Sequence, residues 1–149
     1  MNIIQLNKKV HHDYYILEKL EAGIILKGSE VKSIRKSKIN LKGSFCKFFN
    51  NELFLFDCNI SKYNHQNIFD NFSETRDRKL LINKNQIKKW QKELQLNQGY
   101  SIVPLKVYFN DKNKCKLEIA LVKGKKEYDK RHVQKEKDIQ KKLNKKDYN

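Results

Sequence analysis

Apolar residues between Asp13 and Leu26 predict the first β-strand of the chain. They fall into two groups of β-formers, 14–17 and 24–26, which Glu21-Ala22-Gly23 separates. A glycine inside a strand pattern is typical of a bulge, and we therefore expect a strand that is interrupted at Gly23.

A helix is expected next, over residues 28–36. Ser29 can cap free backbone amides, and Glu30 suits the positive end of a helix dipole. Helical spacing turns Val31 and Ile34 toward the core. It leaves three basic residues outward, namely Lys32, Arg35 and Lys36.

Two β-hairpins follow from the remaining β-patterns. Between Ser44 and Ile60 the apolar run is interrupted by Asn50-Asn51-Glu52, and asparagine tolerates the positive φ of a tight turn. Residues 102–109 and 115–122 alternate in hydrophobicity around an Asn-Asp-Lys-Asn turn, and Pro104 places the first of these strands at an edge or a bulge. A short strand is also expected over 79–82.

A second helix begins after Asn83, whose side chain can cap the amide of Gln86 while Gln86 reciprocates. Gly99 marks its end. Three apolar residues recur on one face, and the tryptophan is expected in the core: Ile87, Trp90 and Leu94.

Two segments lack regular patterns. Residues 61–78 read as a long loop with a few aromatic anchors, a type of loop that is often functional. Beyond Lys123 the chain is rich in lysine and poor in apolar residues, so we expect it to stay flexible. Ile139 and Leu143 lie one helical turn apart, which suggests a helix that forms only against a partner.

Together these elements predict a mainly β fold. Five or six short antiparallel strands and two or three short helices fit a small barrel of the oligonucleotide-binding kind, over residues 1–123. Residues 124–149 form a disordered basic tail in this interpretation.

The charge of the chain points to a polyanionic partner. The 149 residues hold 33 lysines and arginines against 17 acidic residues, a net charge of +16. Nucleic acid is the leading candidate, and an anionic membrane surface is the second. No apolar run is long enough for a spanning helix and no signal-peptide pattern is present, so we expect a cytoplasmic protein.

No constellation of catalytic or metal-binding residues is apparent. The three cysteines, Cys46, Cys58 and Cys115, lack zinc or disulfide spacing and are expected to be free thiols. The pair Glu30 and Asp129 has no reason in sequence to meet, and a helix-end residue and a tail residue are the simpler assignments. We therefore expect no enzyme, no metal and no cofactor.

Several motifs occur in an order that resembles one known family. The octamer at 124–131 reads Gly-Lys-Lys-Glu-Tyr-Asp-Lys-Arg, close to the family pattern G-K-K-x-x-D-K-R. Six further blocks agree, and with them the resemblance covers nearly the whole chain: His12-Asp13-Tyr14, Glu21-Ala22-Gly23-Ile24, the segment 28–35, Asn40-Leu41-Lys42, Arg78-Lys79-Leu80-Leu81 and Val103-Pro104-Leu105-Lys106-x-Tyr108-Phe109. The chain resembles the small protein B family, the SsrA-binding proteins of bacterial trans-translation.

The resemblance implies a function. It implies a barrel that clasps the tRNA-like part of transfer-messenger RNA (tmRNA) and delivers it to ribosomes stalled on broken messages. The tail would enter the empty decoding centre of the small subunit and the message channel, as a helix. Alanyl-tmRNA and elongation factor Tu are implied partners, and a monomer is expected.

The expected site residues form two groups. The barrel group consists of basic residues and one acid: Glu30, Lys32, Arg35, Lys36, Lys38, Arg76, Arg78, Lys79 and Lys84. Glu30 matches an acidic position that the resemblance places at the RNA interface. A simple interaction with the helix dipole is an equal alternative for it. Tyr63 or Phe69 can stack on a base or anchor the loop. The resemblance implies the tail group, which in its absence reads as a solvated charged run: Gly124, Lys125, Lys126, Tyr128, Asp129, Lys130 and Arg131.

The chain departs from the family pattern in the long loop, at Lys62, at 65–67 and at Ser73, and in the tail at Lys137. These departures affect the expected loop conformation. Two alternative functions stay open from the residues alone. One is a ribosomal protein, which also combines a basic barrel with a cationic extension, and the other is an enzyme that modifies or cleaves RNA.

Overall fold

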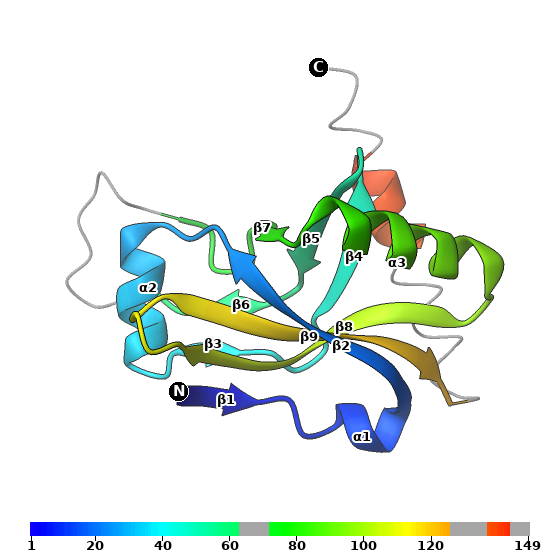
Figure 1. The fold of residues 1–149 in the computed structure, drawn as a ribbon. Coiled ribbons are helices and arrows are strands. Elements are labelled where there is room, and N and C mark those ends of the chain that lie inside the picture. Colours follow the sequence, from blue (N-terminus) through cyan, green and yellow to red (C-terminus); the bar gives the residue numbers. More distant parts are fainter. Residues whose placement is uncertain (63–71, 126–136, 144–149) are drawn as a thin grey trace.

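The computed structural model describes residues 1–62, 72–125 and 137–143, and it is built mainly of strands (Figure 1). A helical segment at 137–143 follows the last strand. No helix within the described residues is long and apolar enough to cross a membrane. The elements are β1 (Asn2–Leu6), α1 (Val10–Asp13), β2 (Tyr14–Ile24), α2 (Gly28–Arg35), β3 (Ile39–Asn40), β4 (Phe45–Phe49), β5 (Glu52–Phe56), β6 (Asn59–Ile60), β7 (Arg78–Leu81), α3 (Lys84–Leu96), β8 (Tyr100–Phe109) and β9 (Cys115–Gly124).

The strands close into an antiparallel barrel. Hydrogen-bonded neighbours run in the order β8, β4, β5, β7, β2 and β9, and β9 pairs again with β8. β1 forms a further antiparallel pair with β8, and β3 and β6 form a separate two-stranded sheet. Closure pairs the backbone groups that an open sheet would leave at its edges. The predicted small antiparallel barrel is confirmed.

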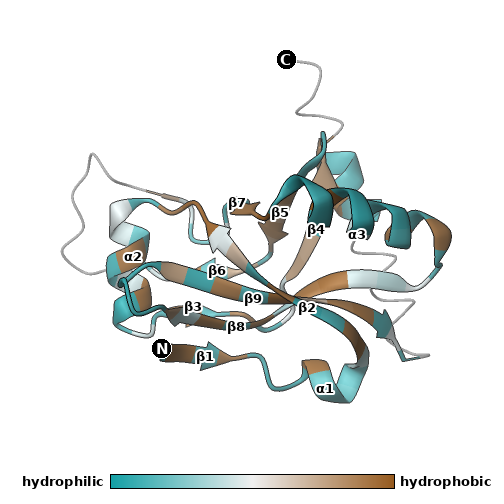
Figure 2. Ribbon diagram, in the orientation of Figure 1, coloured by the Kyte–Doolittle hydropathy of each residue, from teal (hydrophilic) through white to brown (hydrophobic). Residues whose placement is uncertain are grey.

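Alternating side chains of the strands fill the barrel. On β9, the inward residues Leu117, Ile119 and Leu121 are all buried, as their period predicts. α3 covers the barrel with few apolar residues and is largely hydrophilic in Figure 2. Trp90 is its one fully buried residue, and its Nε1 donates a 2.9 Å hydrogen bond to Glu18. The expected core position of Trp90 is confirmed.

Both predicted hairpins are present. Asn50 and Asn51, between β4 and β5, have φ of 50° and 63°, the left-handed conformation that asparagine tolerates. Between β8 and β9 the side chain of Asn110 accepts hydrogen bonds from the backbone amides of Lys112 and Lys114. The asparagines therefore set the turns that the sequence indicated.

One predicted bulge is confirmed and the other is wrong. The register of β8 against β9 shifts between Pro104 and Lys106, and because β8 has neighbours on both sides, Pro104 marks a bulge and not an edge. Gly23 instead lies in regular pairing, and a Cβ there would approach the Cβ of Leu81 to 3.4 Å. This distance is an ordinary van der Waals contact, so the pairing of β2 with β7 does not require a glycine here. The register shift in β2 falls instead between Ile16 and Glu18.

The two main helices begin differently. α3 starts as predicted, because Asn83 Oδ1 accepts from the Gln86 amide at 2.9 Å and the Gln86 side chain accepts from the Asn83 amide. α2 does not start at Ser29, which lies inside the helix and is buried. The side chain of Glu30 takes the capping role by accepting from the backbone amide of Lys27 at 2.8 Å.

The first strand and the first helix were absent from the sequence prediction. β1 depends on partners far away in the chain, because Gln5 donates to the carbonyl of Ile39 and accepts from the amide of Leu41. α1 is a single turn that is fixed by the burial of Val10. Contacts between residues so far apart in the sequence produce no hydrophobic periodicity within a short segment.

Residues 137–143 differ from the expectation of a tail that orders only against a partner. They are helical, and Ile139 and Leu143 are 8% and 6% exposed. Both side chains join a second hydrophobic cluster that also contains Val10, Phe45 and Leu105. The predicted helical pairing of Ile139 with Leu143 is confirmed, but the apolar surface that orders this segment belongs to the chain itself.

Candidate nucleic-acid interface

A buried ion-pair network lies under the outer face of α2. The Glu30 side chain is fully buried, and its carboxylate accepts from Arg76 Nε at 3.0 Å and from Arg78 Nε at 2.7 Å. Burial alone would raise the pKa of Glu30, but the hydrogen bonds from Arg76, the Lys27 amide and Arg78 outweigh it and keep that pKa below its ordinary value. Glu30 is therefore ionised at neutral pH.

Arg78 is the structural partner of Glu30. Its side chain has no exposed surface, and it donates to the carbonyls of Cys58 at 2.8 Å, Arg76 at 3.1 Å and Glu74 at 3.2 Å. A buried guanidinium needs this number of acceptors to offset its lost hydration. Arg78, on β7, thus links the residue before β6 and the residues before β7 to the start of α2.

Two of the residues expected at the RNA interface, Glu30 and Arg78, are buried. Neither side chain reaches the surface in this conformation, so both position other groups. Arg76 keeps a side chain that is 26% exposed while it also donates to Glu30. Of these three residues, only Arg76 can touch a phosphate directly.

The exposed cations of α2 lie on one face of the helix. Lys32, Arg35 and Lys36 are exposed, with the spacing that the sequence predicted, and Lys38 follows half-buried. The guanidinium of Arg35 lies 4.1 Å from the centre of the Phe109 ring and donates to the carbonyl of Asn113. We call Lys32, Arg35, Lys36, Lys38 and Arg76 the α2 basic surface.

Two predicted site residues lie on other elements. Lys79, on β7, forms a 3.3 Å ion pair with Glu52 of the neighbouring strand. Lys84 is exposed and begins α3, which Figure 1 shows well separated from α2. The structure therefore does not bring these two lysines into the α2 basic surface.

The described part of the predicted tail site begins at the end of β9. Gly124 pairs with Tyr14, and the backbone amide of Lys125 donates to the carbonyl of Asp13 at 3.1 Å. The ammonium of Lys125 lies 5.0 Å from the ring centre of Tyr15, a contact that the sequence did not reveal. The other predicted tail residues lie outside the described residues: Lys126, Tyr128, Asp129, Lys130 and Arg131. The loop residues Tyr63 and Phe69 lie outside them as well.

The described residues contain no group of histidines, cysteines and acids that could hold a metal ion. Cys46 and Cys58 are buried and Cys115 is half-buried, as free thiols. Burial raises the pKa of Cys58 to about 12 and that of Cys115 to about 11. These thiols stay protonated at neutral pH and are poor nucleophiles. The prediction of free, half-buried or buried thiols is confirmed.

Known proteins match this chain along nearly its whole length. The sequence profile of the family described as SmpB protein matches residues 4–148. An SsrA-binding protein of Helicobacter pylori (strain Shi470) is 49% identical over 143 residues, which are 96% of this chain and 93% of that protein. An SsrA-binding protein of Fervidobacterium nodosum is 46% identical over 143 residues, which are 96% of this chain and 95% of that protein.

A solved structure agrees with the sequence matches. It is described as "tmRNA-SmpB: a journey to the center of the bacterial ribosome", and one of its chains superimposes with a TM-score of 0.66 at 40% sequence identity. The match covers 81% of this chain and 83% of that chain. The structural match over 81% of the chain and the family profile over residues 4–148 therefore agree on one family.

Proposed function

The chain belongs to the SmpB protein family, and from this premise we propose that it binds the tRNA-like part of tmRNA and delivers that RNA to stalled ribosomes. Its relatives are named SsrA-binding proteins, and a structural relative comes from a tmRNA-SmpB study of the ribosome. This is a family of RNA-binding proteins and not of enzymes. Membership thus argues against the RNA-modifying alternative, and the whole-chain match argues against a ribosomal protein.

The α2 basic surface carries the proposal for the barrel. Its exposed cations stand on a helix whose start is fixed by the Glu30 network, so the charges are held in place before RNA arrives. Such cations bind RNA by neutralising phosphates and releasing counterions, without reading bases. Glu30 and Arg78 act as positioning residues, and Arg76 serves both roles. Lys79 and Lys84 would extend the RNA contact along β7 and the start of α3.

The tail carries the second half of the proposal. Lys125 leaves the barrel at a fixed point, held by the Asp13 carbonyl and by Tyr15. From that point, Lys126 to Arg131 would enter the empty decoding centre and message channel of the small subunit. The division into a barrel over 1–123 and a tail over 124–149 belongs to this proposal. The proposal also includes that the protein acts as a monomer in the cytoplasm, and that alanyl-tmRNA and elongation factor Tu are among its partners.

Binding of the isolated tRNA-like RNA at several salt concentrations tests the barrel proposal. Removal of one lysine that neutralises a phosphate should lower the slope of log affinity against log salt by about 0.9. The double variant Lys32→Ala/Lys36→Ala should weaken binding and lower the slope by nearly two such steps. Lys8→Ala/Lys9→Ala removes the same charge from exposed positions near the N-terminus and is the matched control. Equal effects of the two double variants would contradict a localised interface.

A tagging assay on stalled ribosomes tests the tail proposal. Replacement of Asp129, Lys130 and Arg131 by alanine should abolish tagging and leave binding to the tRNA-like RNA nearly intact. A variant truncated after Arg131 should behave in the same way. Loss of RNA binding in the triple variant, with the fold preserved by circular dichroism, would contradict the division of labour between barrel and tail.

A further inference from the structure

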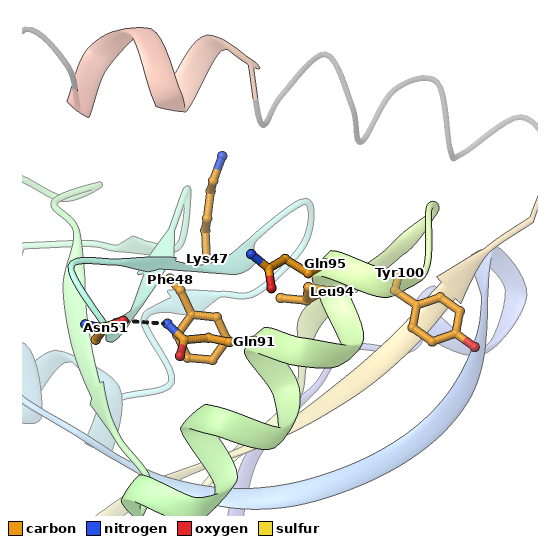
Figure 3. Close-up of a pocket in the computed structure, with 7 residues that line it drawn as sticks. All are labelled: Lys47, Phe48, Asn51, Gln91, Leu94, Gln95 and Tyr100. Atoms are coloured by element: carbon orange, nitrogen blue, oxygen red, sulfur yellow. Dashed lines mark hydrogen bonds between the residues drawn. The ribbon is translucent and has the colours of Figure 1, made fainter.

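A cavity lies between α3 and the β4–β5 hairpin (Figure 3), and no residue of α2 lines it. Its volume is about 440 Å³, within the range of small-ligand sites. The hairpin contributes three of its lining residues, α3 contributes three and the start of β8 contributes one: Lys47, Phe48, Asn51, Gln91, Leu94, Gln95 and Tyr100.

Three amide side chains converge on this cavity. Gln91 reaches from α3 to the hairpin turn, where its Nε2 donates to Asn51 Oδ1 at 3.1 Å (Figure 3). Gln95 is exposed one helical turn further on, and its amide has no hydrogen-bond partner among the described residues. An amide offers a donor and an acceptor side by side, which matches the edge of a nucleobase and of adenine above all.

Apolar surface lines the rest of the cavity. Phe48 and Tyr100 are both partly exposed aromatic residues, and Leu94 is partly exposed on α3. Unpaired RNA bases are bound in proteins by stacking on aromatic rings combined with hydrogen bonds to their edges. The cavity holds both kinds of group within one site.

A row of lysines runs along α3 beside the amides. Lys84, Lys88 and Lys92 are four residues apart and exposed, and none forms an ion pair within the described part of the chain. The one acid of α3, Glu93, accepts from the Asn97 side chain at 3.1 Å, and Glu18 is occupied by Lys89 and Trp90. The row therefore presents uncompensated positive charge next to a base-sized cavity.

We propose that this cavity binds an unpaired nucleotide of single-stranded RNA, with the base against Phe48 and the amides of Gln91 and Gln95, and the flanking phosphates along Lys88 and Lys92. The site is a second RNA contact, separate from the α2 basic surface. It reads a base, whereas the α2 basic surface holds phosphates. A purely polyanionic ligand would use the lysine row and leave the cavity empty.

Two short RNAs of equal charge separate base binding from phosphate binding. Hexa-adenylate or an abasic hexaribonucleotide is added in steps to the full-length, ¹⁵N-labelled protein at constant salt concentration. Hexa-adenylate should bind about tenfold more tightly, the value of one stacked base. Only hexa-adenylate should shift the side-chain amide resonances of Asn51, Gln91 and Gln95. Equal affinities, or unchanged amide resonances, would overturn the proposal.

Variants assign the effect to the cavity. Gln91→Ala/Gln95→Ala changes one half-buried and one exposed side chain of α3, and Phe48→Leu keeps an apolar side chain. Each variant should bring the affinity ratio of the two RNAs close to one. Lys88→Ala/Lys92→Ala should weaken both RNAs equally, while Lys8→Ala/Lys9→Ala should weaken neither by more than its loss of net charge. A normal affinity ratio in the first two variants, together with lost ribosome association, would indicate a protein occupant and overturn the proposal. Failure here leaves tmRNA binding through the α2 basic surface unaffected, because that surface and the lining of the cavity share no residue.

Discussion

The guanidinium of Arg78 and the carboxylate of Glu30 lie 2.7 Å apart, and both side chains are wholly buried. Each ion compensates for part of the hydration that the other loses on burial, and further hydrogen bonds from Arg76 to Glu30 and from Arg78 to the Cys58 carbonyl add to this. The ion pair connects two elements that are distant in the sequence, because Glu30 lies in the first turn of α2 and Arg78 is the first residue of β7. The stability of the fold and the placement of the α2 basic surface therefore depend on the same contact.

Removal of one partner should be costly. Glu30→Ala leaves Arg78 buried and without its carboxylate, and we expect a loss of about 3–5 kcal/mol in the free energy of unfolding. Glu30→Gln keeps the shape and one acceptor and should lose less. Urea denaturation followed by circular dichroism measures both. The control is Glu52→Ala, which breaks the exposed pair with Lys79 and should cost about 1 kcal/mol or less.

The same pair gives a dependence of stability on pH. The pKa of Glu30 is lower in the folded protein than in the unfolded chain, so its contribution is complete above the unfolded value of about 4.3. It is lost as the pH falls through the folded pKa. Between about pH 6 and about pH 3 the wild type should lose more stability than Glu30→Gln. Parallel urea curves of the two proteins across that interval would contradict this assignment.

The turn between β4 and β5 offers a test of backbone strain. Asn50 has a φ of 50°, where a Cβ without a local hydrogen-bonding group is unfavourable. Asn50→Ala should destabilise the protein by roughly 1–2 kcal/mol, and Asn50→Gly should be nearly neutral. Asn85→Ala is a matched control on the exposed surface of α3, where alanine favours the helix and should not destabilise. Thermal denaturation distinguishes the three variants.

The helical segment 137–143 should be held by two side chains. Ile139→Asp places a charge in the second hydrophobic cluster and should release the segment, while the barrel stays folded because its own pairing is unchanged. Hydrogen exchange of the amides at 137–143 should then become fast without a change in exchange on β8 and β9. Lys142→Ala, at an exposed position of the same turn, should leave exchange as in the wild type. Slow exchange in Ile139→Asp would show that other contacts hold the segment.

Elements that depend on residues close together in the sequence were predicted correctly. The hairpin asparagines, the Asn83 cap and the inward face of α3 each depend on residues a few positions apart, so the sequence contains all of their causes. β1 and the regular pairing of Gly23 depend on strands at least 50 residues away in the chain, and no local pattern encodes them. The candidate site divides in the same way. The outward cations of α2 follow from helical spacing, whereas the cavity beside α3 requires the hairpin to meet the helix.

Sequence by itself determined the barrel class, the net charge of +16 and the family, because motifs and alternation persist along the whole chain. Only the tertiary structure decided what each charged residue does. Glu30 and Arg78 are both charged and both near a basic face, yet they are buried together, while Lys32 and Arg35 nearby are exposed. Burial depends on which distant strands close over a residue. That closure buries Glu30 and Arg78 as a pair that stabilises the fold, and it leaves Lys32 and Arg35 at the surface.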